Sequence, residues 1–390
     1  MKKRSILALA LLGGIALASA SGAQAAGEEK YKIGFLGSLT GFLGPFDDPV
    51  LKGMQVAIDE LNKSGGIAGK YPVELTVIDS KSDPAQAQIA GGELIDGGAK
   101  FLIGPCSGDI ALPPAQLAQE AGIPFVSSCS ADSAFVSKVG DAAFLVNPGA
   151  LAEGAALADY AVKTRGFKTA YIVTSKDLVF TQQTSDGFAY TFEKLGGKVV
   201  QTDYVKLWQP SQAAVVSKIK AMDPKPDVIM SSLFVPDMPG FVKELRSAGI
   251  ETPVLLNEGN DTKLFLAPGV QLGDVTVASI GIATPGSALE KFYGLYQAKF
   301  GQAPESNFVG TGGDIVAVMA AAVAAAGSTE PAAVKEALSN LADFDAVTAK
   351  LTYKGAGGIP KRNVFLIAPN QDQSGFELRA TVAPDVVMGQ

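Results

Sequence analysis

The sequence predicts an α/β protein of two lobes, each built around a parallel β-sheet that helices cover on both faces. The chain has 390 residues, about the length of two or three ordinary domains. Short apolar runs alternate with helical patterns over most of this length, as parallel sheets require. Apolar residues make up 47% of the chain and charged residues 18%, so a sizeable core is available.

The elements follow in order from the amino terminus. The apolar run Tyr31 to Gly37 predicts a strand, and Pro49 to Ser64 predicts a helix because its apolar residues share one face of a 3.6-residue period. A second strand is expected at Val73 to Asp79. Asp83 and Pro84 then predict a helix start, because Asp accepts a backbone N–H and Pro fits the first turn. Further strands are expected at 101–104, 124–127, 169–174, 199–204, 227–230, 253–256 and 275–281.

Three turns are candidate crossings between the lobes, at 147–149, 283–286 and 348–353. Three crossings make each lobe discontinuous, which suits closure about a hinge. We therefore expect an N-terminal lobe of residues 28–148 and 284–350, and a C-terminal lobe of residues 149–283 and 351–390. In open parallel sheets, ligands bind beyond the carboxyl ends of the strands, so the functional residues are sought there.

Residues 1–25 predict a secretory signal peptide. Basic residues stand at positions 2–4, an apolar stretch follows at 6–20, and an Ala-Gln-Ala sequence ends at Ala25. No cysteine follows for lipid attachment, and the apolar stretch is shorter than the ~20 residues of a membrane span. We expect cleavage after Ala25 and a soluble periplasmic product. The apolar stretch Ile315 to Ala326 is also short and is expected to form a buried core helix.

Composition excludes several classes of function. The chain has no histidine, and its two cysteines are Cys106 and Cys129, which excludes histidine-ligated metals, histidine triads and Cys-His nucleophiles. The net charge is -7 and no basic run follows the first residues, so no nucleic-acid partner is expected. We expect a small-molecule ligand, no metal and no cofactor.

Motifs for catalysis are incomplete. The chain has no G-x-S-x-G, and neither Gly-Lys pair completes a phosphate-binding loop. The glycines at 65–69 follow a helix, so they predict a loop and not a dinucleotide site. Asp47 and Asp48 leave glycoside hydrolysis open, since it needs only paired carboxylates. Neighbouring side chains usually point in different directions, however, and no enzyme activity is expected.

Two polar loops follow neighbouring strands. The loop 104–109 precedes a helix expected to begin near Ile110, where the Ser107 hydroxyl and the N–H groups around Gly108 are suited to hold an anion. A plain tight turn with a capped helix is the alternative. The loop 127–132, which contains Ser130, follows the next strand. Together the loops resemble a cradle for a carboxylate.

Several segments carry a family resemblance. They read IGFLGSLTGFLGPF, LKGMQVAIDELNKSGGIAGK, VIDSKSDPAQAQIAGGELI, FLIGPCSGDIALPPAQLAQEAGIPFVSSCSA, PDMPGFVKELRSAG and VLLNEGN. In order and spacing the chain resembles the leucine/isoleucine/valine-binding proteins, the exported receptors of branched-chain amino acid ABC transporters. The resemblance implies two Rossmann-like lobes joined by three crossovers, a ligand cleft between them and no catalysis. It also implies ABC transporter permease subunits as partners; the protein itself is expected to be a monomer.

The resemblance assigns polar site residues. The family's carboxylate-binding serine matches Ser107, and its second binding loop matches Cys129 to Ala131. The Cys129 carbonyl would accept from a ligand ammonium, and the Ala131 N–H would donate to the carboxylate. Family members usually have threonine at the position of Ala131, so one hydroxyl contact is missing. The ammonium-binding acid matches Glu258, whose alternative is an exposed loop carboxylate.

The resemblance also assigns three aromatic residues, Phe46, Phe180 and Phe234, where relatives tend to have tyrosine; ordinary core packing is the alternative. Losing the hydroxyls makes the pocket more apolar. We therefore expect an amino acid with an apolar, branched-chain or aromatic side chain. An aromatic carboxylic acid or amide remains an alternative ligand, and a ligand sensor of the same fold an alternative role.

Cys106 and Cys129 lie in the two cradle loops, in a compartment that permits disulfides. A bond between them needs Cα atoms within about 7 Å. A disulfide and a pair of buried thiols both remain open.

Overall fold

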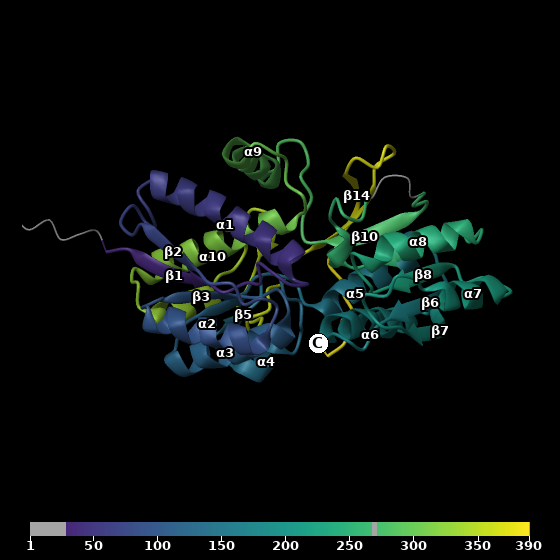
Figure 1. Ribbon diagram of the computed structural model, residues 1–390, viewed down its shortest axis with the longest axis horizontal. Coiled ribbons are helices and arrows are strands. Elements are labelled where there is room, and N and C mark those ends of the chain that lie inside the picture. The colour runs from purple at the N-terminus through teal and green to yellow at the C-terminus, as the bar shows by residue number, and fades with distance from the viewer. Residues whose placement is uncertain (1–28, 267–270, 390) are drawn as a thin grey trace, which may run out of the picture.

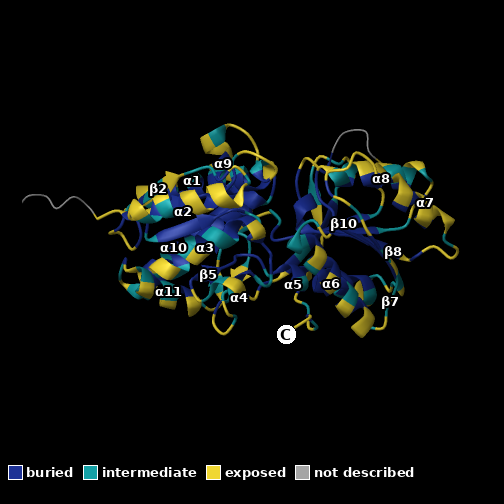
Figure 2. Cartoon of the chain, turned by 60° about the horizontal axis from the view of Figure 1, so that its bottom comes forward, coloured by how far each residue is buried: buried dark blue, intermediate teal, exposed yellow. Residues whose placement is uncertain are grey.

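The computed structural model describes residues 29–266 and 271–389, which form two lobes joined at their centre (Figure 1). The predicted signal peptide, residues 1–25, lies outside the described residues. Each lobe has a central β-sheet whose strands are largely buried, with helices that expose one face to solvent (Figure 2). The predicted α/β fold of two lobes is confirmed.

The N-terminal lobe contains a five-stranded sheet in the order β2-β1-β3-β4-β5, and every pairing in it is parallel. Its strands are β1 (Tyr31–Phe35), β2 (Val73–Val77), β3 (Phe101–Gly104), β4 (Phe125–Ser127) and β5 (Ala143–Phe144). Its helices are α1 (Gly44–Lys63), α2 (Pro84–Asp96), α3 (Gly108–Ala121), α4 (Phe135–Val139), α9 (Ala288–Phe300), α10 (Phe308–Ala326) and α11 (Pro331–Ser339). The last three return from the far half of the chain and pack here.

The C-terminal lobe contains a seven-stranded sheet in the order β14-β13-β10-β9-β8-β6-β7. Its strands are β6 (Thr169–Thr174), β7 (Lys198–Tyr204), β8 (Val228–Ser231), β9 (Val254–Leu256), β10 (Val275–Ser279), β13 (Val364–Pro369) and β14 (Phe376–Val382). Its helices are α5 (Ala150–Asp159), which continues as a π-helical turn over Tyr160–Thr164, α6 (Val179–Lys194), α7 (Ala213–Ala221) and α8 (Asp237–Ser247). The antiparallel strands β13 and β14, of which β14 forms one edge of the sheet, were not among the predicted strands.

Helix α1 begins earlier than predicted. The sequence pattern placed the start at Pro49, whereas the helix begins at Gly44 with Pro45 in its first turn, where a missing N–H costs nothing. Pro49 lies inside the helix and removes one backbone hydrogen bond. Burial of Phe46 against the core offsets that loss. The predicted start of α2 is confirmed, because Asp83 Oδ1 accepts from Gln86 N at 2.8 Å.

Helix α10 contains the apolar stretch that was expected in the core. By length and composition it is the one helix among the described residues that passes for a membrane span, yet 72% of its apolar window is buried within the protein. It packs against α1, where Gly53 and Gly312 lie against each other's helix backbone. A Cβ at either position would overlap the facing backbone, so both glycines permit the close approach.

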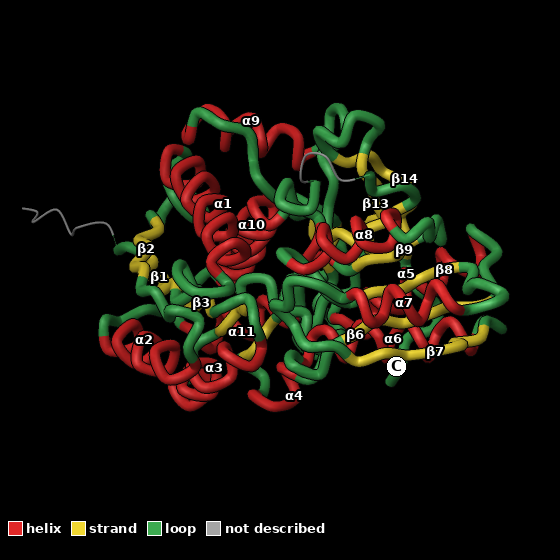
Figure 3. The backbone as a smooth tube through the Cα atoms, turned by 45° about the vertical axis from the view of Figure 1, so that its right-hand side comes forward, coloured by secondary structure: helices red, strands yellow, loops and turns green. Residues whose placement is uncertain are grey.

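Loops gather between the lobes (Figure 3). Arg362 contacts the chain near all three crossings. Its guanidinium donates to Val146 O at 2.7 Å, Ile280 O at 2.5 Å and Thr348 Oγ1 at 2.7 Å. Val146 and Ile280 lie just before the first two predicted crossings, and Thr348 begins the third. Arg362 also pairs with the buried Asp314 of α10 at 3.4 Å. A single fully buried cation therefore ties the three chain segments of the hinge together.

Candidate ligand-binding site

A cavity of about 60 Å³, partly open to solvent, lies between the lobes. The structure brings every predicted site residue to its wall. The N-terminal lobe contributes Phe46, Ser107, Gly108, Cys129, Ser130 and Ala131, and the C-terminal lobe contributes Phe180, Phe234 and Glu258. Their roles in binding stay predictions, but their convergence gives one site with polar groups from loops that follow strands of both sheets.

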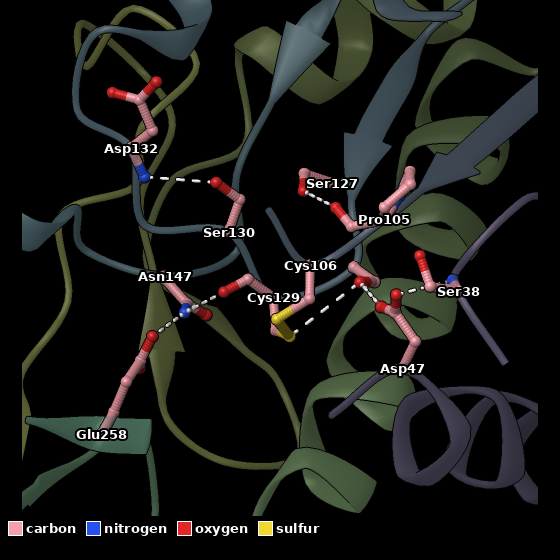
Figure 4. The surroundings of a disulfide bond; sticks show 11 residues. Ser38, Asp47, Pro105, Cys106, Ser127, Cys129, Ser130, Asp132, Asn147 and Glu258 are labelled. Carbon is pink, nitrogen blue, oxygen red and sulfur yellow. Dashed lines mark hydrogen bonds between the residues drawn. A yellow bond between two sulfur atoms is a disulfide. The ribbon is translucent and has the colours of Figure 1, made fainter. Parts of the chain in front are cut away.

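The two cradle loops are joined by a disulfide between Cys106 and Cys129, whose Cα atoms lie 4.5 Å apart (Figure 4). Of the two states that the sequence left open, the structure therefore has the bonded one. Cys106 follows β3 and Cys129 follows β4, so the bond fixes the spacing of the loops at the base of the cavity. Both sulfurs belong to the disulfide, so neither is a thiolate that could bind a metal ion together with the neighbouring Asp47.

Asp47 of α1 stabilises the base of the site through hydrogen bonds. Its Oδ2 accepts from Ser38 N at 2.7 Å, and its Oδ1 accepts from the Ser128 hydroxyl (Figure 4). Burial raises the pKa of Asp47 to about 7, although both hydrogen bonds pull it down. Asp48 points elsewhere and pairs with Lys52 at 2.6 Å. The adjacent acids therefore do not converge on one point, and Asp47 connects three loops of the N-terminal lobe.

The N-terminus of α3 forms one end of the cavity. Ser107 stands at the N-cap, where its carbonyl accepts from Ala111 N at 2.8 Å, but its side chain makes no capping hydrogen bond. Its hydroxyl thus remains available to the cavity, beside first-turn N–H groups that have no partner within the helix. Gly108 is required here, because a Cβ would lie 2.8 Å from the Asp132 Cβ. This end of the cavity is suited to a carboxylate.

The second loop is shaped by its own hydrogen bonds. Ser130 Oγ accepts from Asp132 N at 3.2 Å, so this predicted site residue also holds the turn (Figure 4). The Ala131 carbonyl accepts from Ala150 N at 2.6 Å, which attaches the loop to the start of α5. Ala131 reaches the cavity wall with a methyl group in place of a hydroxyl.

Glu258 lies opposite, in the 3₁₀ turn Glu258–Asn260 that follows β9. It is 4% exposed, which excludes the alternative of an exposed loop carboxylate. Its Oε1 accepts from Asn147 Nδ2 at 2.7 Å, and the same nitrogen donates to Cys129 O at 2.9 Å (Figure 4). Burial raises the pKa of Glu258 to about 8, while the Arg362 charge and the Asn147 hydrogen bond pull it down. Both predicted ammonium acceptors therefore meet at one end of the cavity.

Two further acids line the cavity, Asp109 and Asp132. Asp132 accepts from Gln183 Nε2 at 2.8 Å and pairs with Lys138 at 3.4 Å. Burial and the Asp132 charge raise the pKa of Asp109. The sequence analysis missed both, although they belong to the two predicted loops. Among the described residues, no lysine or arginine lines this cavity, so its electrostatics favour a ligand that carries a cationic group.

Aromatic rings form the apolar wall. The ring centroids of Phe46 and Phe234 lie 5.8 Å apart, and those of Phe180 and Phe234 lie 6.4 Å apart. Phe308 of α10 extends the group, 5.6 Å from Phe46. It was missed because it opens an apolar helix whose pattern indicates core packing. The wall offers aromatic faces without hydroxyl groups, which suits an apolar side chain.

Other contacts hold the lobes against each other. Gln183 of α6 accepts from Ser133 N at 2.8 Å with its Oε1, while its Nε2 contacts Asp132. Phe42 and Trp208 place their rings 5.2 Å apart from opposite lobes. The cavity is therefore flanked by interlobe contacts that include both polar and aromatic groups.

The chain also matches known proteins along most of its length. The family model described as "Periplasmic binding protein" matches residues 30–374. The Leu/Ile/Val-binding protein homolog 3 of Brucella melitensis is 26% identical over 361 residues, which cover 92% of this chain and 96% of the relative.

Two solved structures share the fold. One is the branched-chain amino acid transporter substrate binding protein of Streptococcus pneumoniae in complex with isoleucine, with 22% identity, a TM-score of 0.78, and coverage of 90% of this chain and 99% of that one. The other is a solute binding protein of an ABC transporter from Rhodopseudomonas palustris in complex with 3,4-dihydroxy benzoic acid, with 19% identity, a TM-score of 0.79, and coverage of 92% and 99%. On its matched length and on this architecture, the chain belongs to the periplasmic binding protein family.

Proposed function

We propose that the protein captures an amino acid with an apolar, branched-chain or aromatic side chain and delivers it to the permease subunits of an ABC importer. One observation carries this proposal: a single cavity has an anion-binding helix terminus at Ser107, two ammonium acceptors at Cys129 and Glu258, and an aromatic wall. These three features match the carboxylate, the amine and the side chain of such a ligand. The branched-chain amino acid receptors among the relatives support it.

Binding is proposed to proceed by closure of the lobes. The N-terminal lobe holds the carboxylate first, through Ser107 and the loop from Cys129 to Ala131. Closure then brings Glu258, Phe180 and Phe234 over the ligand. Because only the closed form makes both sets of contacts, the ligand shifts the population toward it by its differential affinity. The permease would then recognise the closed form.

The lobe limits and location belong to the same proposal. The sheets and helices support divisions near residues 148 and 284. Tyr353 Oη donates to Leu145 O at 2.6 Å and Leu145 N donates to Gly358 O at 2.9 Å, so residues 353–358 pack on the N-terminal lobe and we place the third division after Gly358 instead of at 350. The basic and apolar pattern of residues 1–25 supports export to the periplasm through a cleaved signal peptide.

An aromatic carboxylic acid is the second candidate, favoured by the phenylalanine wall and by the R. palustris protein bound to 3,4-dihydroxy benzoic acid. A ligand without an amine leaves Glu258 without a cationic partner, and in the described part of the chain no basic side chain lines the cavity. These two observations favour the amino acid.

A ligand panel tests the proposal. Thermal unfolding and calorimetric titration of the mature protein should be run with leucine, valine and phenylalanine, with 4-methylpentanoate and 3-phenylpropanoate, and with benzoate and phenylacetamide. A bound ligand stabilises the folded protein by RT ln(1 + [L]/Kd) and therefore raises the melting temperature. Amino acids should bind and their amine-free analogues should not. Tight binding of benzoate alone would instead support the second candidate, and recovery of an altered compound would indicate an enzyme.

A further inference from the structure

Asn147 occupies an unusual position between the lobes. It stands at the first crossing and is fully buried. Its side-chain nitrogen donates to Cys129 O in the N-terminal lobe at 2.9 Å and to Glu258 Oε1 in the C-terminal lobe at 2.7 Å (Figure 4). One NH₂ group thus donates its two hydrogens to the two acceptors that the proposed function assigns to the ligand ammonium.

The two hydrogen bonds that Asn147 donates fix the orientation of its amide. The Asn147 Oδ1 is buried and has no hydrogen-bond partner, an arrangement that costs free energy. A flip of the amide would point Oδ1 at the Cys129 carbonyl, which can only accept, and would remove the hydrogen bond that Asn147 donates to Glu258. The side chain is therefore held for the two bonds that it donates.

A second contact fixes the backbone of Glu258. Its N–H donates to Glu153 Oε1 of α5 at 2.9 Å. The carboxylate is held by Asn147 through Oε1, and no hydrogen bond within the described residues uses Oε2. Since Glu258 lines the cavity, its second oxygen remains for a ligand.

The charges that face Glu258 come from three elements. Glu153 on α5 and Asp261 after the 3₁₀ turn are buried acids, and burial and the Glu258 charge raise the pKa of each. Arg362, near the third crossing, has the opposite effect. Asn147 is the neutral neighbour that favours the ionised carboxylate by direct hydrogen bonding. Its removal leaves Arg362 as the neighbour that favours the ionised carboxylate.

We propose that Asn147 is the positioning residue that selects for an amine on the ligand. It holds a carbonyl of one lobe and a carboxylate of the other around a single nitrogen, and it helps to keep the carboxylate charged. The inference rests on the proposed function, because it concerns the ammonium end of the same site. Asn147 does not itself line the cavity.

The test measures selectivity rather than affinity alone. Dissociation constants for leucine and 4-methylpentanoate, and for phenylalanine and 3-phenylpropanoate, are measured on the mature wild type and on Asn147→Ala. Loss of two hydrogen bonds, one of them to a carboxylate, should lower the preference for the amine-bearing ligand about 10- to 100-fold. The pH at which amino-acid affinity is half-maximal should also move upward, because Glu258 loses a donor that favours its charge.

Two further variants serve as controls. Asn147→Ser retains one donor, should show an intermediate loss, and replaces Asn147→Ala if that variant does not fold. Gln183→Ala removes another amide that bridges the lobes but touches neither Cys129 nor Glu258. It should weaken both members of each ligand pair equally and leave the pH midpoint in place.

The possible results separate the two proposals. If the wild type binds neither amino acid, or binds only the amine-free acids, the proposed function is wrong and this role of Asn147 is wrong with it. If the wild type prefers the amine and the Asn147 variants keep that preference, or behave like Gln183→Ala, the inference alone is overturned.

Discussion

The rings of Phe42 and Trp208 lie 5.2 Å apart at 61°, although Phe42 belongs to the N-terminal lobe and Trp208 to the C-terminal lobe. Both side chains are partly exposed, at 37% and 44%. Trp208 has a positive φ of 57°, and its N–H donates to Asp237 Oδ2 at 2.6 Å. The edge-to-face pair therefore spans the lobes outside the ligand cavity.

This pair predicts an optical signal for lobe closure. Trp208 is the one tryptophan of the chain, so its fluorescence reports its own surroundings without interference. A ligand that closes the lobes should change the emission, and Phe42→Ala should abolish most of that change. It should also weaken binding of every ligand by about 0.5 to 1.5 kcal/mol, the usual value of an aromatic pair. An unchanged emission response in Phe42→Ala would show that the pair does not report closure.

Glu258→Ala tests the ammonium site directly. Removing the acid that faces a buried ammonium should weaken binding of leucine or phenylalanine by about 2 to 5 kcal/mol. Binding of an amine-free acid should change far less. Glu251→Ala, which removes an exposed carboxylate from the same lobe, is the matched control and should leave the calorimetric affinity unchanged. Equal affinity of Glu258→Ala and wild type for an amino acid would refute the assignment.

The predicted parts of the fold and site depend on local patterns. Ser107 follows a short apolar strand, and the carboxyl ends of parallel strands share one edge, so the local pattern placed it near the cleft. Glu258 also follows a strand, but the family resemblance was what assigned it to the site. Edge strand β14 was missed because its burial is uneven and its residues are mostly exposed, which weakens the apolar signal.

The parts that sequence reasoning missed depend on contacts between distant segments. Asn147 has the pattern of an ordinary turn residue, and its two bonds reach 18 and 111 positions along the chain. Arg362 follows a turn and has no local signal, yet it bonds to residues near all three crossings. Such roles depend on how distant segments of the chain pack together in the folded protein, and no short stretch of sequence encodes that packing.

The disulfide should stabilise the protein and its cradle. Cys106 and Cys129 are separated by 23 positions, and closing a loop of that size contributes about 3 kcal/mol in the chain-entropy account. Replacing both cysteines with serine should lower the free energy of unfolding by about that amount in urea titrations. Ligand affinity should fall as well, because both cysteines line the cavity. Wild type treated with a reductant provides the comparison, and unchanged stability and affinity in both would contradict the role of the bond.

Proton linkage should appear first in the stability of the unliganded protein. Burial raises the pKa of Asp47 from its ordinary value of 3.8 to about 7, and that of Glu258 from 4.5 to about 8. At pH values between the ordinary pKa and the raised pKa of each group, the folded chain holds a proton that the unfolded chain has lost. The free energy of unfolding should therefore fall as the pH rises from about 5 to 8. Urea titrations at several pH values measure this slope. Asp47→Asn and Glu258→Gln should each flatten it.

The same linkage should govern binding of an amino acid, with the opposite dependence on pH. The ammonium pairs with ionised Glu258, which is largely protonated below its pKa of about 8. Affinity should therefore rise by up to tenfold per pH unit between pH 6 and 8, with release of a proton at neutral pH. Calorimetry in two buffers of different ionisation enthalpy counts that proton. Glu258→Gln should bind with little dependence on pH, whereas a wild-type affinity that stays constant from pH 6 to 8.5 would contradict pairing of the amine with this carboxylate.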